Sequence, residues 1–374
     1  MAKNKKIGLL NFHYSNHNYG AVLQASALEY CIREKGYQVE HIDFIPQKKV
    51  SFIGKLKSRL KPIIQPIDKF NLVTKDKVDF KPEGSFVFED FRKKWISRSI
   101  TYNSIENLEK IKDYTDIIVG SDQVWRPYYT KNFSKVYFLD FCGSSVNKVS
   151  YAASFGCDEW DNKNHSISEY KPLLEQFDAI SVRENTGVSI CNDVFNIKAE
   201  HVLDPTLLVG KEFFNRISGD IHYTENKNLD IIYYKLDVSS DFLSMIDVVT
   251  HENKRTFSNI YYKKLEGVYL YNSVEEWVSK IRDANLILTD SFHCVCLSLL
   301  FHKQFIVIAN ETRGLTRLIS LLKPLGLEER ICFNDLEIKE KILNDAIIDY
   351  KVVDAKLSIL REKSMSFLIN SLRK

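Results

Sequence analysis

The stretch NFHYSNHNYGAVLQ, residues 11–24, decides the fold of this chain. It follows an apolar run that includes Ile7, Leu9 and Leu10, and a helix pattern begins directly after Gly20. A strand that leads into a helix through asparagine, histidine and glycine is typical of α/β proteins. The first backbone N–H groups of such a helix lack intrahelical partners and can bind anions or sugars. The stretch therefore predicts an α/β fold with a ligand site at the edge of its sheet.

Three later stretches also place unusual polar residues where a predicted strand ends. They read GSDQVW at 120–125, SVRE at 181–184 and TDSFH at 289–293. In open α/β sheets, ligands bind in the crevice outside the carboxyl ends of the strands. We therefore expect polar side chains of these stretches to line a cleft.

Together the four stretches resemble the polysaccharide pyruvyl transferase family. The resemblance covers most of the chain and is carried, in order, by NYGAVLQASAL, VGSDQVWRP, SYAASFG, ISVREN, VLDPTLLV and DSFHCVCLSLLF, followed by Arg313 and Arg317. It implies two Rossmann-like domains in a glycosyltransferase-B-like arrangement, with the ligand cleft between them. It also implies transfer of the pyruvyl group of phosphoenolpyruvate to sugar hydroxyls, which forms a cyclic ketal.

The composition indicates a soluble globular protein. The 374 residues suffice for two domains of ordinary size, and the net charge of +3 is too small to indicate nucleic-acid binding. The seven cysteines form no CxxC pair, so we expect reduced thiols rather than disulfides or a zinc site. The N-terminal apolar run is too short for a signal peptide, and no run reaches the ~20 residues that span a bilayer. We therefore expect a cytoplasmic protein.

The apolar pattern predicts two α/β domains. The first covers residues 1–210 and carries a basic insertion at about 46–85, where several prolines interrupt the pattern. Its strands and helices alternate as in a parallel sheet. The strands are predicted at 5–12, 37–44, 116–120, 146–153, 179–182 and 200–203, and the helices at 20–35, 86–95 and 105–112.

The second predicted domain covers residues 225–345 and again alternates strands with helices. By resemblance to glycosyltransferase-B folds, a terminal helix at 353–372 is expected to cross back to the first domain. Within the second domain the strands are predicted at 229–234, 285–289 and 304–309, and the helices at 274–283 and 291–302.

Arg183 is the first candidate for donor binding. Phosphoenolpyruvate carries a carboxylate and a phosphate, and a planar guanidinium pairs with both groups through bidentate hydrogen bonds. Arg183 directly follows the predicted strand 179–182, at the edge of the sheet where clefts form. In the family the arginine of the SxRE motif contacts the donor, so the resemblance implies this role for Arg183. From the residues alone, an ion pair between Arg183 and Glu184 is the commoner explanation.

His293 is the candidate general acid. It occupies the third position of a helix that Ser291 or Asp290 would cap. The helix N-terminus disfavours imidazolium, whereas a trianionic donor bound nearby would favour it. Pyruvyl transfer needs this proton, because protonation of the methylene carbon makes the next carbon an electrophile for a sugar hydroxyl. The resemblance places the family's acid–base histidine at His293 and adds Ser291 to the donor site, although Cys294 replaces the usual glycine. The alternative is an exposed histidine in a capped helix.

The stretch GSDQVWRPYY at 120–129 is the candidate acceptor site. A carboxylate that binds two hydroxyls beside an aromatic ring is a common way to hold a sugar. We expect Asp122 and Gln123 to bind hydroxyls and Trp125 to cover the C–H face of the sugar. The alternative, of equal weight, has Ser121 and Asp122 capping a helix while Trp125 packs in the core.

Asn18 and Tyr19 are expected to line the same cleft on the acceptor side, with His13 and His17 nearby. The two histidines share no helical register and have no cysteine or carboxylate close by in the sequence, so we expect no metal. The turn that begins at Asp204 is interpreted as structural.

Arg313 and Arg317 lie on one face of a predicted helix and could meet the donor phosphate across the cleft, although a solvated face is the commoner explanation. Residues 47–64 combine six basic residues and no acid with apolar side chains. This composition is typical of a segment that lies on anionic membrane, which would suit a lipid-linked acceptor. An insertion docked on the protein is the somewhat favoured alternative.

We therefore predict a pyruvyltransferase of capsule, exopolysaccharide or cell-wall sugar biosynthesis, with phosphoenolpyruvate as donor and no cofactor. The first alternative is a glycosyltransferase of the same fold with a nucleotide-sugar donor. It would need an acidic residue for the ribose hydroxyls in the second domain, and no convincing candidate stands out. The second alternative is a non-catalytic sugar-binding protein, which would keep Asp122 and Trp125 but has no use for Arg183 and His293 together.

Overall fold

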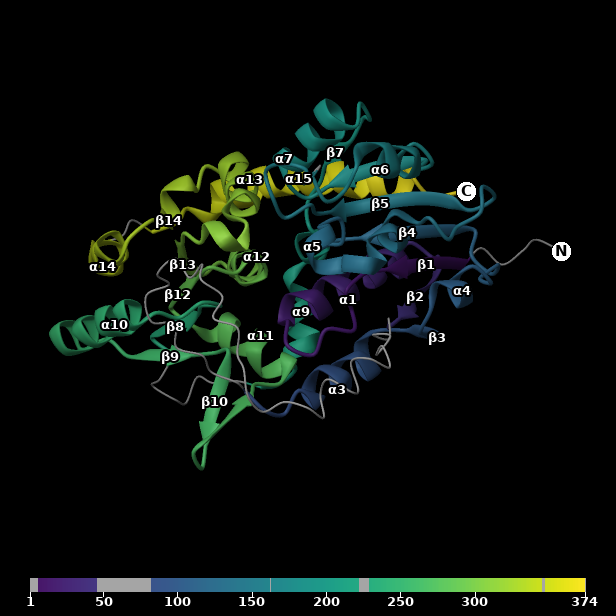
Figure 1. The fold of residues 1–374 in the computed structure, drawn as a ribbon. Coiled ribbons are helices and arrows are strands. Elements are labelled where there is room, and N and C mark those ends of the chain that lie inside the picture. Colours follow the sequence, from purple (N-terminus) through teal and green to yellow (C-terminus); the bar gives the residue numbers. More distant parts are fainter. Residues whose placement is uncertain (1–5, 46–81, 162, 222–228, 345–346, 374) are drawn as a thin grey trace, which may run out of the picture.

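The computed structural model describes residues 6–45, 82–161, 163–221, 229–344 and 347–373. Within these residues the chain builds two parallel sheets that stand side by side, with helices around both (Figure 1). Most of the predicted insertion, including the candidate membrane segment 47–64, lies outside the described residues. In the described part, no helix has the length and apolarity needed to cross a bilayer.

The first sheet has seven strands in the order β3-β2-β1-β4-β5-β6-β7, and all neighbouring pairs are parallel. Every residue of β4 and β5 is buried, as expected for central strands covered on both faces. The strands are β1 (Lys6–Leu10), β2 (Gln38–Phe44), β3 (Arg98–Tyr102), β4 (Asp116–Gly120), β5 (Asn147–Ala153), β6 (Ala179–Val182) and β7 (Glu200–His201).

Helices connect these strands as parallel pairing requires. Several of them are short, and the polar residues that follow the strands lie just before them. They are α1 (Tyr19–Glu34), α3 (Phe86–Trp95), α4 (Ile105–Leu108), α5 (Pro127–Thr130), α6 (Ile167–Leu174), α7 (Asn185–Ser189), α8 (Pro205–Leu208) and α9 (Lys211–Ser218).

The second sheet has five parallel strands in the order β14-β13-β12-β8-β9, and an antiparallel hairpin, β10–β11, projects away from it (Figure 1). Its strands and the hairpin are β8 (Ile231–Tyr234), β9 (Phe257–Asn259), β10 (Tyr262–Leu265), β11 (Val268–Tyr271), β12 (Leu286–Thr289), β13 (Gln304–Ile308) and β14 (Ile331–Cys332). Its helices are α10 (Ser240–Asn253), α11 (Val274–Asp283), α12 (Phe292–Leu300), α13 (Leu315–Leu325) and α14 (Asp335–Asn344).

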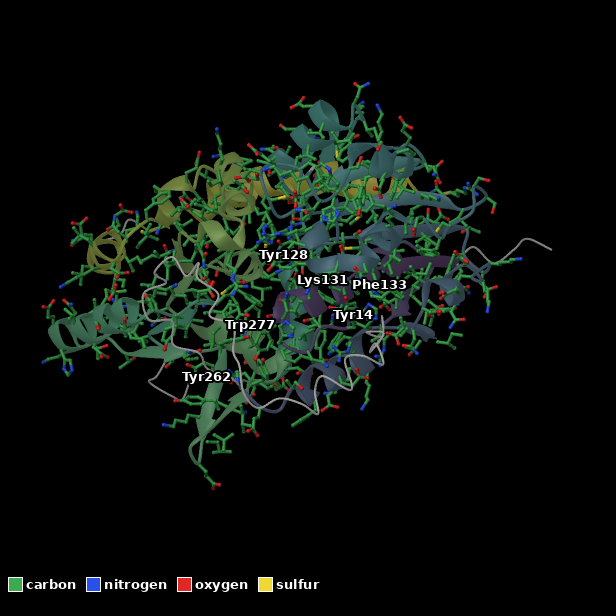
Figure 2. The ribbon with its side chains drawn as sticks, viewed as in Figure 1. Tyr14, Tyr128, Lys131, Phe133, Tyr262 and Trp277 are labelled. Carbon is green, nitrogen blue, oxygen red and sulfur yellow. The ribbon has the colours of Figure 1, made fainter. Side chains whose placement is uncertain are left out.

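Helix α1 is the central packing element between the two sheets. Asn18 begins it, because its side-chain oxygen accepts a hydrogen bond from the backbone N–H of Ala21 at 3.1 Å. Thirteen of its sixteen residues are buried, so α1 has almost no solvated face. At its first turn the Tyr19 ring stacks on Trp277 of α11, with 4.9 Å between the ring centroids. Trp277 lies in the middle of the molecule (Figure 2). The N-terminus of α1 is therefore fixed where the two sheets meet.

The last helix, α15 (Tyr350–Asn370), contacts elements of both sheets. Near its start, the Tyr350 hydroxyl donates a hydrogen bond to the backbone carbonyl of Ser298 in α12 at 3.3 Å. At its end, the carbonyl of Ser371 accepts a hydrogen bond from Asn147 of β5 at 2.7 Å. Figure 1 shows α15 running from the region of α13 to β5. The predicted domain limits themselves stay a prediction.

The sequence locates the strongly patterned elements well. Helices α3 and α11 and strands β4 and β6 begin and end at the predicted residues. The prediction omits β3, whose sequence RSITY is half-exposed at the edge of the first sheet and therefore lacks an apolar pattern. It also omits α10, α14 and the β10–β11 hairpin.

Candidate active site

A cavity of about 620 Å³ opens where the two sheets meet. One side comes from the loop before α1 and from the turn after β4. The other side comes from the ends of β8 and β12 and the starts of α12 and α13. Its lining residues are Phe12, Tyr14, Ser15, Asn16, His17, Asn18, Ala21, Asp122, Gln123, Tyr129, Tyr234, Leu236, Tyr261, Asp290, Ser291, Phe292, His293, Arg313 and Arg317.

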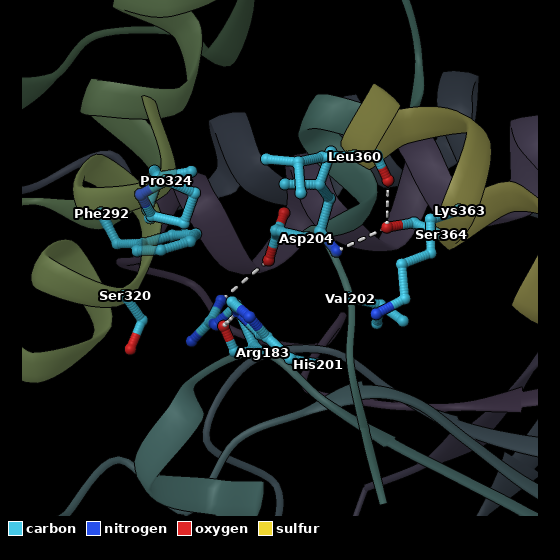
Figure 3. A pocket seen from close by; sticks show the side chains of 12 residues that line it. Arg183, His201, Val202, Asp204, Phe292, Ser320, Pro324, Leu360, Lys363 and Ser364 are labelled. Atoms are coloured by element: carbon cyan, nitrogen blue, oxygen red, sulfur yellow. Dashed lines mark hydrogen bonds and ion pairs between the residues drawn. The ribbon is translucent and has the colours of Figure 1, made fainter. Parts of the chain in front are cut away.

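Arg183 lies next to this cavity at the centre of a buried charge cluster. Its Nη1 donates a hydrogen bond to Oδ2 of Asp204 at 2.8 Å, and its Nη2 lies 3.5 Å from Oδ1 of Asp122 (Figure 3 shows Arg183 and Asp204). The guanidinium also covers the Phe292 ring, 4.4 Å from its centroid. Glu184 is not its ion-pair partner, because the Glu184 carboxylate accepts hydrogen bonds from the segment after β5. The alternative of an Arg183–Glu184 pair is therefore wrong.

The predicted exposure of Arg183 in the cleft also needs correction. Its side chain is only 1% exposed and is absent from the cavity wall. It lines instead a small hollow of about 20 Å³ behind Phe292 (Figure 3). The reason is that the carboxylates of Asp204 and Asp122 hold the guanidinium outside the cavity wall. A direct contact between Arg183 and the donor stays a prediction.

The sequence predicts a structural role for Asp204, but its carboxylate contacts both Arg183 and His293, the candidate general acid. Oδ2 of Asp204 lies 3.5 Å from Nε2 of His293, and that nitrogen lies 3.4 Å from Nη1 of Arg183. Burial opposes ionisation of this carboxyl, yet His293 and Arg183 hold the pKa of Asp204 well below its ordinary range. The sequence signal was available, because Asp204 also follows a predicted strand of the same sheet.

His293 is the second residue of α12 and not the third, and no side chain caps this helix. Ser291 is the capping position but makes no side-chain cap hydrogen bond. The Asp290 carboxylate instead accepts hydrogen bonds from Leu236 N at 2.8 Å and Asn310 Nδ2 at 3.0 Å. The Ser291 side chain therefore does not satisfy the first N–H groups of α12, and both Ser291 and His293 line the cavity.

Gly20 is required because the His293 ring lies directly against α1. A Cβ atom at Gly20 would be 2.0 Å from Nδ1 of His293, which no side chain tolerates. The stretch at residues 11–24 and the TDSFH stretch at 289–293 are therefore in contact in the folded chain. One ring nitrogen of His293 faces Asp204 and Arg183, and the other faces the start of α1.

Arg313 and Arg317 both line the cavity, but they do not share a helix face. Arg313 ends a short 3₁₀ turn, and Gly314, in a left-handed conformation at φ 77°, separates it from α13, which carries Arg317. Arg313 forms a bidentate ion pair with Asp237 at 2.7 and 2.9 Å. Arg317 is buried and, within the described part of the chain, donates hydrogen bonds to the backbone carbonyls of Arg313 and Gly314.

Arg317 forms no ion pair with any described carboxylate. Burial, together with the nearby charge of Arg183, lowers the pKa of Arg317 to about 10. A buried guanidinium without a counter-ion is costly, and an anion bound in the cavity would relieve that cost. The position therefore has the properties of an anion site.

On the acceptor side, Asp122 and Gln123 line the cavity as the sequence suggests. Asp122 has a left-handed backbone at φ 64°, a conformation that aspartate adopts more readily than most residues other than glycine. Gln123 lies against Gly156 and accepts a hydrogen bond from Arg126 at 2.8 Å. The alternative in which Ser121 caps a helix does not hold, because its hydroxyl donates to Asp204 at 2.6 Å.

Trp125 and Tyr19 do not reach the cavity. The Trp125 ring is fully buried and stacks on Phe138, and its Nε1 donates to the carbonyl of Tyr137. Tyr19 packs on Trp277, and its hydroxyl donates to the carbonyl of Asn272. Both rings therefore belong to the core, which contradicts their predicted roles as acceptor ligands. Sequence reasoning selected the wrong aromatic residue, because Tyr129 is the ring of this stretch that lines the cavity.

His13 and His17 have different surroundings. His13 is buried and pairs with Asp43, with 2.9 Å between Nε2 and Oδ1. Burial lowers the pKa of His13 to about 4 despite this hydrogen bond. His17 is exposed and lines the cavity, as does Asn18. Among the described residues, no three His, Cys, Asp or Glu side chains are placed to hold a metal ion.

Comparison with known proteins concerns the family and the fold of this chain. A family model described as polysaccharide pyruvyl transferase matches residues 18–312. A search of curated protein sequences finds no match. Among solved structures, the chain is similar to S. aureus MnaA in complex with UDP, at a TM-score of 0.53 and 10% identity, with 99% of this chain and 98% of that chain covered.

It is also similar to a putative UDP-N-acetylglucosamine 2-epimerase from Listeria monocytogenes. That match has a TM-score of 0.53 and 9% identity and covers 99% of this chain and 96% of the other. At such identities the likeness concerns the fold alone. The predicted glycosyltransferase-B-like α/β fold is thereby confirmed.

Proposed function

This chain belongs to the polysaccharide pyruvyl transferase family, and from that membership we propose that it moves the pyruvyl group of phosphoenolpyruvate onto two hydroxyls of a sugar. The product is a cyclic ketal, and the pathway is the synthesis of a bacterial surface polysaccharide. The observation that carries the proposal is Arg317, a buried cation that forms no ion pair among the described residues, in the wall of a cavity that His293 also lines. Donor anion and candidate proton donor would therefore meet in one place.

The donor side of the cavity is the side of α12 and α13. Arg317 and Arg313 would bind the phosphate or the carboxylate of phosphoenolpyruvate, since guanidinium groups pair with both. The first N–H groups of α12, beside Ser291, would add hydrogen bonds to an anion. Arg183 would act from outside the cavity wall, through its contacts with His293 and Asp204.

The acceptor side is the side of the turn after β4 and the loop before α1. Asp122, Gln123 and Asn18 would bind sugar hydroxyls. Tyr129 would provide the aromatic surface that Trp125 cannot provide, because its ring lies on the cavity wall and is 41% exposed.

The reaction that fits these positions balances without a cofactor. A proton moves from His293 to the methylene carbon of the donor, and a sugar hydroxyl oxygen bonds to the neighbouring carbon. Phosphate then leaves, and a second hydroxyl closes the ketal ring. Of the two hydroxyl protons released, one returns to His293 and the other leaves with phosphate. His293 would thus act as general acid and regain its proton in the same turnover.

Arg317→Gln is expected to weaken phosphoenolpyruvate binding by about 10–100-fold, the usual weight of a charge-assisted contact. Because Arg317 has no carboxylate partner among the described residues, its loss is not expected to lower the melting temperature. Isothermal calorimetry with phosphoenolpyruvate and thermal unfolding are the two measurements. Arg216→Gln, which removes a guanidinium that covers Tyr30 far from the cavity, is the matched control. Unchanged donor affinity in Arg317→Gln would contradict the proposed donor site.

A peripheral contact with the inner face of the membrane through residues 47–64 would bring the enzyme to a lipid-linked acceptor. This part of the proposal rests on the composition of the segment alone. Replacement of Lys55, Lys57, Arg59 and Lys61 by Gln is expected to weaken binding to anionic vesicles by about 1 kcal/mol per charge at low salt. Co-sedimentation with vesicles of anionic and of neutral lipid tests it, and binding that does not depend on salt or lipid charge would contradict it.

A further inference from the structure

Asp204 is the most heavily hydrogen-bonded carboxylate next to the cavity. Its Oδ1 accepts hydrogen bonds from the backbone N–H of Thr206 at 2.9 Å and from the Thr206 hydroxyl at 2.7 Å. Its Oδ2 accepts from Ser121 at 2.6 Å and from Arg183 at 2.8 Å, and it faces His293 at 3.5 Å. The side chain is fully buried. Such a carboxylate is rigid and ionised, and one of its oxygens faces the candidate acid.

The charges around His293 come from several elements. Asp204 and Arg183 face its Nε2, and Asp122 is the second carboxylate on Arg183. On the opposite side, the start of α1 covers the ring at Gly20. The remaining charges near the cluster are Arg317 on α13 and the buried Glu184, whose pKa burial raises. Asp204 is therefore the carboxylate in direct reach of the imidazole.

These contacts bear on which ring nitrogen of His293 carries a proton. An ionised carboxylate only accepts hydrogen bonds, so the ring nitrogen that faces Asp204 must carry a proton to interact favourably with it. The positive charge of Arg183 acts on the same nitrogen in the opposite sense. Without Asp204, the imidazole would face an uncompensated guanidinium.

We propose that Asp204 is a positioning residue for His293: its carboxylate fixes the imidazole ring, keeps a proton on the nitrogen that faces it and stabilises the protonated ring against Arg183. This role rests on the proposed function, in which His293 delivers a proton to the donor. It also explains why this aspartate begins α8, because the backbone N–H of Thr206 holds Oδ1 and leaves Oδ2 directed toward His293.

The first test measures the protonation of the His293 ring in the absence of substrate. Histidine is labelled with ¹⁵N, and the ring signals of His293 are identified by their loss in His293→Gln. In the parent protein the nitrogen facing Asp204 is expected to be protonated. In Asp204→Asn this preference is expected to be lost, since the amide can donate as well as accept. Identical ring signals in the two proteins would overturn the proposal. This result does not depend on the reaction that the enzyme catalyses.

The second test is the pH profile of the single-turnover rate at saturating donor. In Asp204→Asn the loss of rate on the alkaline side is expected to begin about 1 pH unit lower, because an opposite charge near the ring has been removed. Thr206→Val, which touches only Oδ1, is the matched control and should leave the profile in place. A rate that falls equally at every pH would overturn the positioning role and leave a structural one.

Ser121→Ala serves where Asp204→Asn does not fold. It removes one donor from Oδ2 and leaves the carboxylate in place. Oδ2 then interacts more strongly with the imidazolium, so the alkaline loss of rate is expected to move to slightly higher pH, opposite to Asp204→Asn. An unchanged profile in a folded Ser121→Ala protein would count against the proposal. Calorimetry with phosphoenolpyruvate on each variant separates a failure of this inference from a failure of the donor site.

Discussion

Replacing His293 with glutamine is expected to slow the bound-state reaction by about 10²–10⁴-fold, the usual contribution of a general acid. Glutamine keeps much of the size of the ring but cannot deliver a proton to the methylene carbon. The proton is needed only on the way to the transition state, so donor binding should persist. Single-turnover release of phosphate, at saturating phosphoenolpyruvate with an accepted sugar, measures the rate, and calorimetry measures the affinity.

His17→Gln is the control for this experiment. His17 lines the same cavity, whereas His13 is buried against Asp43 and cannot reach a substrate without rearrangement. Retained turnover in His293→Gln, with loss in His17→Gln, would move the role of proton donor to His17. Lost donor binding with an unchanged bound-state rate would make His293 a ligand only.

Replacing Arg183 with alanine is expected to destabilise the fold by about 3–5 kcal/mol, because it leaves the carboxylates of Asp204 and Asp122 buried without their cation. Loss of an arginine that only bound a ligand at the surface would not change the free energy of unfolding in this way. The extreme burial of Arg183, 1% exposed, is the reason for the difference. Chemical denaturation followed by circular dichroism measures the change. Turnover should fall as well, because Arg183 supports His293.

Arg313→Ala is the matched control. Its ion pair with Asp237 is partly exposed, at 38% and 20%, and pairs of this kind contribute about 0–1 kcal/mol. If Arg183→Ala were as stable as Arg313→Ala yet failed to bind the donor, Arg183 would be a direct ligand and its burial would not reflect the working state.

The ion pair between Arg183 and Asp204 makes the free energy of unfolding depend on pH in acid. The pKa of Asp204 is held well below its ordinary value by His293 and Arg183, in spite of burial. A depressed carboxyl pKa contributes stability that is present above the unfolded value of ~4 and is lost as the pH falls below it. In Arg183→Ala this contribution of Asp204 is smaller. The difference in free energy of unfolding between the variant and the parent protein should therefore decrease as the pH falls below ~4.

The sequence by itself determined the fold and the strand ends whose following polar residues are candidates for the site. Parallel strands place their carboxyl ends at one edge, so a polar residue after an apolar run is already assigned to that edge. Asp122, Gln123, Asn18 and His293 were found in this way, Arg317 followed from the family resemblance, and all five line one cavity. The family followed from the same residues.

Only the tertiary structure decided which side chains of these strand ends face the cavity and which do not. Trp125 and Tyr129 are four residues apart, before and within α5, yet the first packs on Phe138 and the second lines the cavity. Arg183 lies outside the cavity wall, where two carboxylates offset the cost of burying its charge. Such choices depend on which partners the other elements bring within a few ångströms, and those distances are set by packing between elements far apart in sequence.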